Sequence, residues 1–136
     1  MADALVMQKM DALSRCVDRI EQKRPVSYPM LEQDLDAQDI ISINLERAVQ
    51  QCVDAAMIVL SNLGAQVPAT MGEAFDELHA RGVIDEKLCK SMQNAVGFRN
   101  LLVHAYRKID WRIVWNIITG NMDDFRRFAA AVVRVA

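Results

Sequence analysis

Apolar residues recur every three or four positions along most of the chain, which is the period of an amphipathic α-helix. The pattern predicts a first helix over residues 2–24, which Pro25 ends, and then a loop bracketed by Pro25 and Pro29. A second, longer helix is predicted over residues 40–60, with Gly64 as its C-terminal cap. Its apolar arc is wide, so we expect this helix to be buried or to line a contact with another chain.

Capping signals divide the rest of the chain into further helices. Thr70 followed by Glu73 is a capping-box pattern and predicts a helix that extends to about Ala80. Asp85 is the expected N-cap of a helix that runs to about His104. Two more helices are predicted, over residues 111–119 after Asp110 and over residues 123–135 after a break at Gly120 and Asn121.

The predicted fold class is all-α, because no segment shows the alternating pattern of a strand. Helices joined by short loops pack antiparallel, which favours an up-and-down four-helix bundle with one or two short additional helices. A length of 136 residues predicts a single domain over 1–136, and 52% apolar with 25% charged residues fits a compact fold. No apolar stretch approaches the roughly 20 residues of a membrane span, and the N-terminus lacks a secretory pattern, so we expect a cytoplasmic protein.

Three cysteines stand far apart in the sequence. Cys16, Cys52 and Cys89 lack the short paired spacing of a zinc site, and their odd number does not fit a disulfide framework. They are predicted to be buried apolar residues in a reducing compartment. Clustered carboxylates are missing as well, so the sequence predicts no metal and no cofactor.

Charge is distributed unevenly about a formal net value of −2. Residues 1–98 hold nine Lys and Arg against fifteen Asp and Glu, a balance of −6, whereas residues 99–136 hold seven against three, a balance of +4. An acidic chain still binds a polyanion if its positive charge gathers at one surface. Ordinary surface variation explains the asymmetry equally well.

The stretch from Gly97 to Tyr106 is the most informative part of the chain. It contains Arg99, His104 and Tyr106 in the pattern Arg-x4-His-x-Tyr. The arginine is a permanent cation, the histidine transfers protons near neutral pH, and the tyrosine adds a phenol. These groups suit a site that cleaves phosphate esters, although spacing alone more often marks an ordinary structural histidine.

The periodicity of a helix separates two of these side chains. Arg99 and His104 point about 140° apart on a regular helix, so the pair of one chain does not converge on one phosphate. Either the helix opens near His104, or the Arg and His of two subunits meet across a dimer axis. Asn100 lies one turn before His104 and is expected to support it by a hydrogen bond that sets its tautomer.

RNA provides its own nucleophile in the 2′-hydroxyl, so a protein needs to supply only a base or acid and a cation. His104 fits the first role and Arg99 the second. Tyr106 fits a hydrogen-bond donor or a surface on which a base stacks. The candidates for contacts with the RNA backbone, with a solvated helix end as the alternative, are Arg107, Lys108 and Arg112.

The run FRNLLVHAY, residues 98–106, resembles the signature of HEPN ribonucleases, in which Arg and a polar residue are followed after a short gap by His. The Tyr two positions later is similar to the HepT branch of that superfamily. Other segments resemble this branch in the expected order, so the likeness covers roughly residues 39–128. The first helix matches only in kind, and the family often has Gly where this chain has Ala105.

The resemblance implies a HEPN-like helical bundle that forms a homodimer and cleaves RNA, with transfer RNA as one candidate, without a metal. It also implies a type VII toxin-antitoxin system, in which an MNT-type nucleotidyltransferase antitoxin attaches AMP to the motif tyrosine, here Tyr106. The alternative is a HEPN nucleotide-binding or scaffold subunit that partners a nucleotidyltransferase and cleaves nothing. The intact pair of Arg99 and His104 favours the enzyme, because a scaffold has no chemical need for it.

Overall fold

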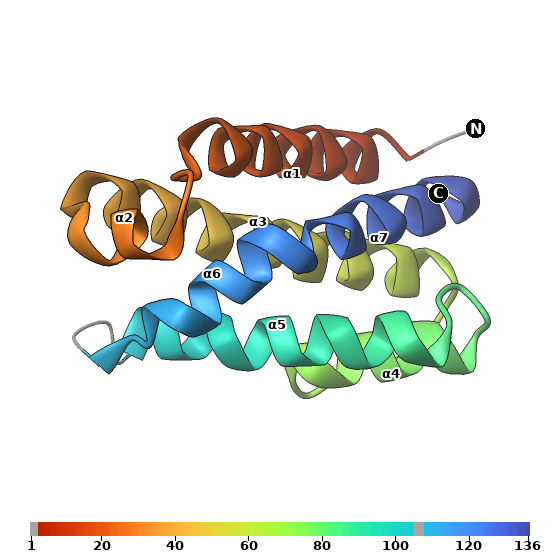
Figure 1. Cartoon of the computed structure of the whole chain (residues 1–136). Helices are drawn as coiled ribbons and strands as arrows, with labels where there is room; N and C mark the ends of the chain where they lie inside the picture. Colours follow the sequence, from red (N-terminus) through yellow and green to blue (C-terminus); the bar gives the residue numbers. More distant parts are fainter. Residues whose placement is uncertain (1–2, 105–107) are drawn as a thin grey trace.

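The computed structural model describes residues 3–104 and 108–136 (Figure 1). These residues form helices and no strand, which confirms the predicted all-α class. In chain order the helices are α1 (Ala4–Lys23), α2 (Tyr28–Gln33), α3 (Leu35–Asn62), α4 (Met71–Ala80), α5 (Glu86–His104), α6 (Trp111–Gly120) and α7 (Met122–Val135).

The longest helix, α3, is central to the bundle. It packs against α1, α2, α4, α5 and α7, while α6 contacts α2 and leads into α7. Figure 1 shows α1 along one side of the bundle and α4 with α5 along the other, with α6 crossing α5 obliquely. The end of α5 therefore lies at the end of the bundle opposite the C-terminus of α7.

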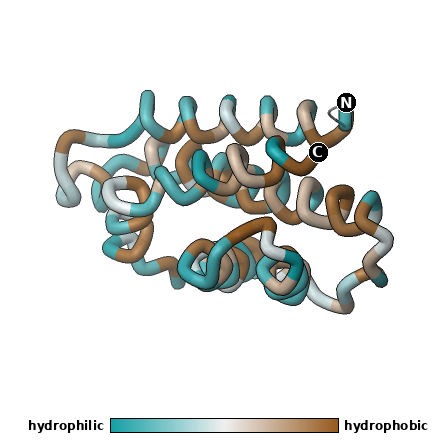
Figure 2. Tube along the Cα trace, turned by 90° about the vertical axis from the view of Figure 1, so that its right-hand side faces the viewer, coloured by the Kyte–Doolittle hydropathy of each residue, from teal (hydrophilic) through white to brown (hydrophobic). Residues whose placement is uncertain are grey.

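Hydrophobic and hydrophilic residues are interspersed along the chain and do not gather in one segment (Figure 2). The buried apolar side chains of all seven helices merge into one core. At its centre Phe75 and Phe128 meet edge to face, with ring centroids 5.6 Å apart and an interplanar angle of 75°. Of the described helices, none is long and apolar enough to span a lipid bilayer.

The segment between the first two predicted helices differs from the expectation. The predicted loop at Pro29 is instead part of helix α2, because proline is tolerated in the first turn, where its missing N–H has no intrahelical acceptor. The next helix begins at Leu35 and not near residue 40. Asp34 caps it by accepting a hydrogen bond of 3.0 Å from the N–H of Ala37.

A buried glutamine explains why the segment 35–39 is helical. The Nε2 group of Gln38 donates to the carbonyl oxygens of Leu31 and Glu32, each at 3.0 Å. These carbonyls lie in the last turn of α2 and have no intrahelical partner. From the first turns of α3, Gln38 therefore provides the hydrogen bonds that the last carbonyls of α2 lack. The spacing of apolar residues does not predict this contact.

The predicted helix ends at two glycines are confirmed. Gly64 and Gly82 both have φ of +76°, the left-handed conformation that glycine adopts without strain. After α3 the N–H of Gly64 bonds to Ser61 and that of Ala65 to Leu60, both at 3.0 Å, which is the Schellman pattern. The same pair of bonds closes α4 at Gly82.

The predicted N-terminal caps form as well. The N–H of Glu73 donates to the Thr70 hydroxyl oxygen at 3.2 Å, while the Glu73 carboxylate accepts from the N–H of Ala69 at 3.1 Å. The Asp85 carboxylate accepts from Leu88 at 2.7 Å and starts α5. Asp110 starts α6 in the same way.

Candidate active site

The motif occupies the C-terminal part of α5. This helix is regular from Glu86 to His104, so Arg99 and His104 keep the stagger of about 140° that the periodicity predicts. Within the described residues the helix does not open before His104. The two side chains accordingly have different surroundings.

Arg99 is half-buried against α3. Its Nη2 group donates to the Oε1 atom of Gln50 at 3.1 Å, and its Nη1 group makes a longer, exposed bond of 3.4 Å to the Oδ1 atom of Asn100. Its Nε atom is buried and finds no acceptor among the described residues. No carboxylate of the described chain pairs with this guanidinium, so its charge is not neutralised by an ion pair.

Gln50, which accepts the hydrogen bond from Arg99, is part of a series of polar contacts that joins three helices. Gln50 donates from Nε2 to the Oδ1 atom of Asp54 at 2.8 Å. The other carboxylate oxygen of Asp54 accepts from the Nζ atom of Lys9 on α1 at 3.1 Å. We call these four residues, Lys9, Asp54, Gln50 and Arg99, the polar relay.

Sequence reasoning missed the first three members of the polar relay. Gln50 and Asp54 stand one turn apart on α3, and both interrupt its apolar arc. Two polar residues at i and i+4 on a mostly buried helix are the signal that identifies such a pair. Nothing in the sequence alone indicates that Arg99 lies opposite them.

Among the residues that it describes, the structure does not show the hydrogen bond that was expected between Asn100 and His104. Asn100 bonds to Arg99, and no hydrogen bond links it to His104 in the described part of the chain. An exposed asparagine one turn away satisfies its amide in water or with the neighbouring guanidinium equally well. His104 is exposed at the last position of the helix and is open to solvent on the described surface.

Two predicted site residues, Tyr106 and Arg107, lie outside the described residues. Lys108 is exposed, in keeping with a contact to a polyanion. The guanidinium of Arg112 lies 3.8 Å from the ring centroid of Tyr28, whose hydroxyl donates to Glu32. Arg112 thus stacks on α2 and fixes the start of α6 there.

Basic residues of the C-terminal region do not all gather near His104. Arg126 pairs with Glu21 and with Asp123, and Arg127 lies 3.9 Å from Asp124. Both arginines belong to α7, which leads away from the end of α5 (Figure 1). Asp123 and Asp124, already counted in the balance of residues 99–136, are thus paired on α7, and Glu21 of α1 adds one carboxylate from outside this region.

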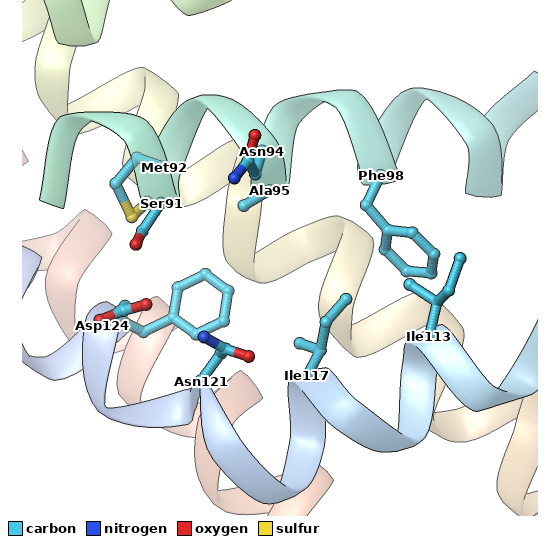
Figure 3. A pocket seen from close by; sticks show the side chains of 10 residues that line it. Ser91, Met92, Asn94, Ala95, Phe98, Ile113, Ile117, Asn121 and Asp124 are labelled. Atoms are coloured by element: carbon cyan, nitrogen blue, oxygen red, sulfur yellow. The ribbon is translucent and has the colours of Figure 1, made fainter. Parts of the chain in front are cut away.

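A pocket of about 250 Å³ opens between α5, α6 and α7, next to the motif (Figure 3). Phe98 of α5 and Ile113 of α6 face each other at one end of it. Ser91, Asn121 and Asp124 line the other end. Its walls are mainly apolar, and the site residues Arg99 and His104 are not among them.

Exposed apolar side chains accompany the motif. Leu101 and Val103 on α5 and Ile113 on α6 are 51%, 41% and 44% exposed. They lie at the same end of the bundle as His104. On a regular helix Leu101 and Val103 point about 160° apart, so these side chains flank the exposed face of α5 and do not form one continuous patch.

The described residues contain no cluster of three His, Cys, Asp or Glu side chains able to hold a metal ion. As predicted, Cys16, Cys52 and Cys89 are buried and form no disulfide. Burial is the largest cause that raises the pKa of each thiol above its usual range. Protonated thiols are poor nucleophiles, so these cysteines take no part in the site.

Comparison with known protein families identifies the family of this chain. The family model described as "Ribonuclease HepT-like" matches residues 13–132. The chain is a member of the HepT-like ribonuclease family. The match includes α2 to α6 completely and therefore contains the whole Arg-x4-His-x-Tyr motif.

The matches to two HepT relatives extend over most of both chains. The "mRNA nuclease HepT" of Shewanella oneidensis is 27% identical over 124 residues, which is 91% of this chain and 92% of that protein. The "tRNA nuclease HepT" of Aphanizomenon flos-aquae is 26% identical, over 89% of this chain and 82% of that one. Two HepT proteins of similar distance thus carry names with different RNA substrates.

Solved structures agree with the family. The tri-AMPylated HEPN toxin of Shewanella oneidensis, in complex with its MNT antitoxin, superimposes with a TM-score of 0.90 at 25% identity and covers 96% of this chain and 97% of that one. A toxin-antitoxin complex with AMP-PNP gives 0.89. The cytosolic protein YutE of Bacillus subtilis, only 13% identical, shares the fold with a TM-score of 0.78.

Proposed function

We propose that this HepT-like protein is an endoribonuclease toxin in which Arg99 and His104 act on the scissile phosphate of RNA. The observation that carries the proposal is the structural environment of Arg99 and His104. Arg99 is held in place without an ion pair, five residues before an exposed histidine, in the fold of a known toxin. Relatives named as nucleases of messenger RNA and of transfer RNA support the substrate class.

The reaction needs no metal in this proposal, because RNA supplies the nucleophile. His104 accepts the proton of the 2′-hydroxyl, whose oxygen forms a bond to phosphorus as the bond to the 5′-oxygen breaks. The leaving oxygen takes up a proton from an acid or from water. The Arg99 guanidinium stabilises the charge that develops on the non-bridging oxygens.

A second copy of the chain completes the proposed site. Five residues on a regular helix separate Arg99 and His104 by about 7.5 Å along the axis and about 140° around it. Arg99 faces α3, whereas His104 faces solvent. A homodimer formed at the exposed end of α5 brings the histidine of one protomer towards the arginine of the other.

The proposed partner is a nucleotidyltransferase of the MNT type. Similar structures contain a HEPN toxin with such an antitoxin, and one of those toxins is AMPylated. In this chain the proposed acceptor is Tyr106, two residues after His104 in the sequence. Each AMP adds a phosphate near the motif, which repels the RNA backbone and occupies the site.

The test compares two histidine substitutions in the purified protein and in cells. His104→Ala should abolish RNA cleavage and relieve growth arrest. His79→Ala should retain both activities, because His79 lies on α4, outside the motif, where its ring hydrogen-bonds to the carbonyl of Ile84. A folded parent protein that leaves RNA intact, yet binds ATP in calorimetry, would instead support the scaffold alternative.

A further inference from the structure

We propose that Gln50 is a positioning residue for Arg99, and that the polar relay holds this guanidinium while leaving its positive charge available to an RNA phosphate. The inference rests on the proposed function. It adds three residues, Gln50, Asp54 and Lys9, that the motif does not contain.

The relay fixes the side chain of Gln50 in one orientation. Arginine only donates hydrogen bonds and an ionised aspartate only accepts them. Gln50 stands between Arg99 and Asp54, so its amide satisfies both neighbours only when the oxygen faces Arg99 and the nitrogen faces Asp54. The two contacts of 3.1 and 2.8 Å have this arrangement.

Asp54 is in turn held from the far side. Its second oxygen accepts from Lys9 at 3.1 Å, and both side chains are about one third exposed. The Asp54 charge is thus balanced by a lysine on α1. Three helices, α1, α3 and α5, therefore contribute to the position of one guanidinium.

In the polar relay the neutral amide of Gln50 lies between the Arg99 guanidinium and the Asp54 carboxylate. An amide, which is neutral, contacts Arg99, while the negative charge of Asp54 lies one turn further along α3. Attraction between opposite charges falls with distance, and a carboxylate in direct contact would compete with phosphate for the same donors. Gln50 therefore anchors the Nη2 group without neutralising the cation.

The remaining donors of Arg99 show which edge meets the substrate. Nε is buried, and Nη2 is engaged with Gln50. Nη1 makes only the long bond to exposed Asn100, so it is the donor that solvent and a phosphate can reach. The relay aims this edge outward at the end of α5.

A charge-swapped pair tests the inference. The double variant Gln50→Glu with Asp54→Asn moves one negative charge next to Arg99, keeps the total charge and preserves a donor and acceptor at each contact. Its matched control, Gln51→Glu with Asp54→Asn, places the same charge on the neighbouring residue of α3. Thermal unfolding midpoints and kcat and KM for a short RNA are measured for both.

We expect the charge-swapped pair to unfold near the temperature of its control but to cleave RNA at least about tenfold more slowly, because a tenfold change corresponds to partial loss of one charged contact. Equal cleavage by the two double variants would overturn the inference. So would a loss confined to variants whose unfolding midpoint falls, since that result indicates a structural role alone.

Binding separates this inference from the proposed function. A single-stranded DNA oligonucleotide lacks the 2′-hydroxyl and serves as an uncleavable probe. If the parent binds it but cleaves no RNA, the proposed function fails, while weaker binding by the charge-swapped pair still supports the relay. Gln50→Met should also weaken binding in the parent but not in an Arg99→Ala background, since its effect passes through Arg99.

Discussion

The two halves of α5 differ in what they bury. In residues 86–96 the apolar side chains of Leu88, Cys89, Met92 and Val96 are all in the core. In residues 97–104 only Leu102 is buried, while its apolar neighbours on either side are exposed. One continuous helix thus has a half with four side chains in the core and a half in which Leu102 alone is fully buried.

The difference indicates that the second half of α5 contains the residues with the proposed functional role. The polar contacts of the first half join it to α4, from Cys89 to Asp76 at 3.6 Å and from Gln93 to the carbonyl of Gly72 at 3.1 Å. The second half has an arginine held by another helix and a terminal histidine without a partner among the described residues. Three experiments test this division.

Subunit mixing should have the largest effect. Arg99→Ala and His104→Ala should each lower cleavage by about 10²–10⁴-fold, because each removes a group that acts in the transition state. If the site is shared between protomers, a mixture of the two variants regains about one quarter of the parent activity, since half of the dimers are mixed and each has one complete site. Absence of recovery in a mixture shown to contain mixed dimers would assign the site to one chain.

Core truncation should separate the two halves by stability. Met92→Ala removes a side chain that is 1% exposed and should lower the free energy of unfolding by about 2–5 kcal/mol. Leu101→Ala removes a side chain that is 51% exposed. This substitution should change the free energy of unfolding by less than about 0.5 kcal/mol in dilute, monomeric solution. Urea unfolding of both variants measures the contrast. Similar losses would show that the second half is also core.

Thiol reactivity should show the smallest effect and report on the first half alone. The pKa of Cys89 is raised by burial first and by the neighbouring Asp76 second, so the thiol stays protonated as pH rises through its ordinary value of 9.0. In the unfolded chain the same thiol ionises near that value, so its contribution to stability decreases above pH 9.0. Alkylation of the Cys89 thiol by iodoacetamide at pH 9 should be at least about tenfold slower in the native protein than in urea. Equal rates would mean that this half opens readily.

The sequence predicted the helices whose ends are marked by local chemistry. Gly64, Gly82, Asp85 and Asp110 act within a few residues, so their effect can be read from neighbouring positions. Helix α2 was missed because its support comes from Gln38 in the next helix. Helices α1, α3, α5 and α7 form the predicted bundle, with α4 and α6 as the expected short additions.

The same limit applies to the site. The motif residues Arg99 and His104 were found because they are close in sequence and their types suggest chemistry. Gln50 is 49 residues from Arg99, and its role depends on how α3 and α5 align in the bundle. Helical spacing places Asn100 near both Arg99 and His104 and does not decide between them, whereas the structure shows a contact of 3.4 Å with Arg99.

The central position of α3 has a consequence for how the sequence can change over time. A helix that packs against five others has few positions at which a substitution affects only one neighbour. Mutational tolerance should therefore be lowest along α3, and its polar residues Gln38, Gln50 and Asp54 should tolerate change as poorly as its apolar ones. The outer face of α1 is free to vary, so lineages of this protein should diverge fastest there.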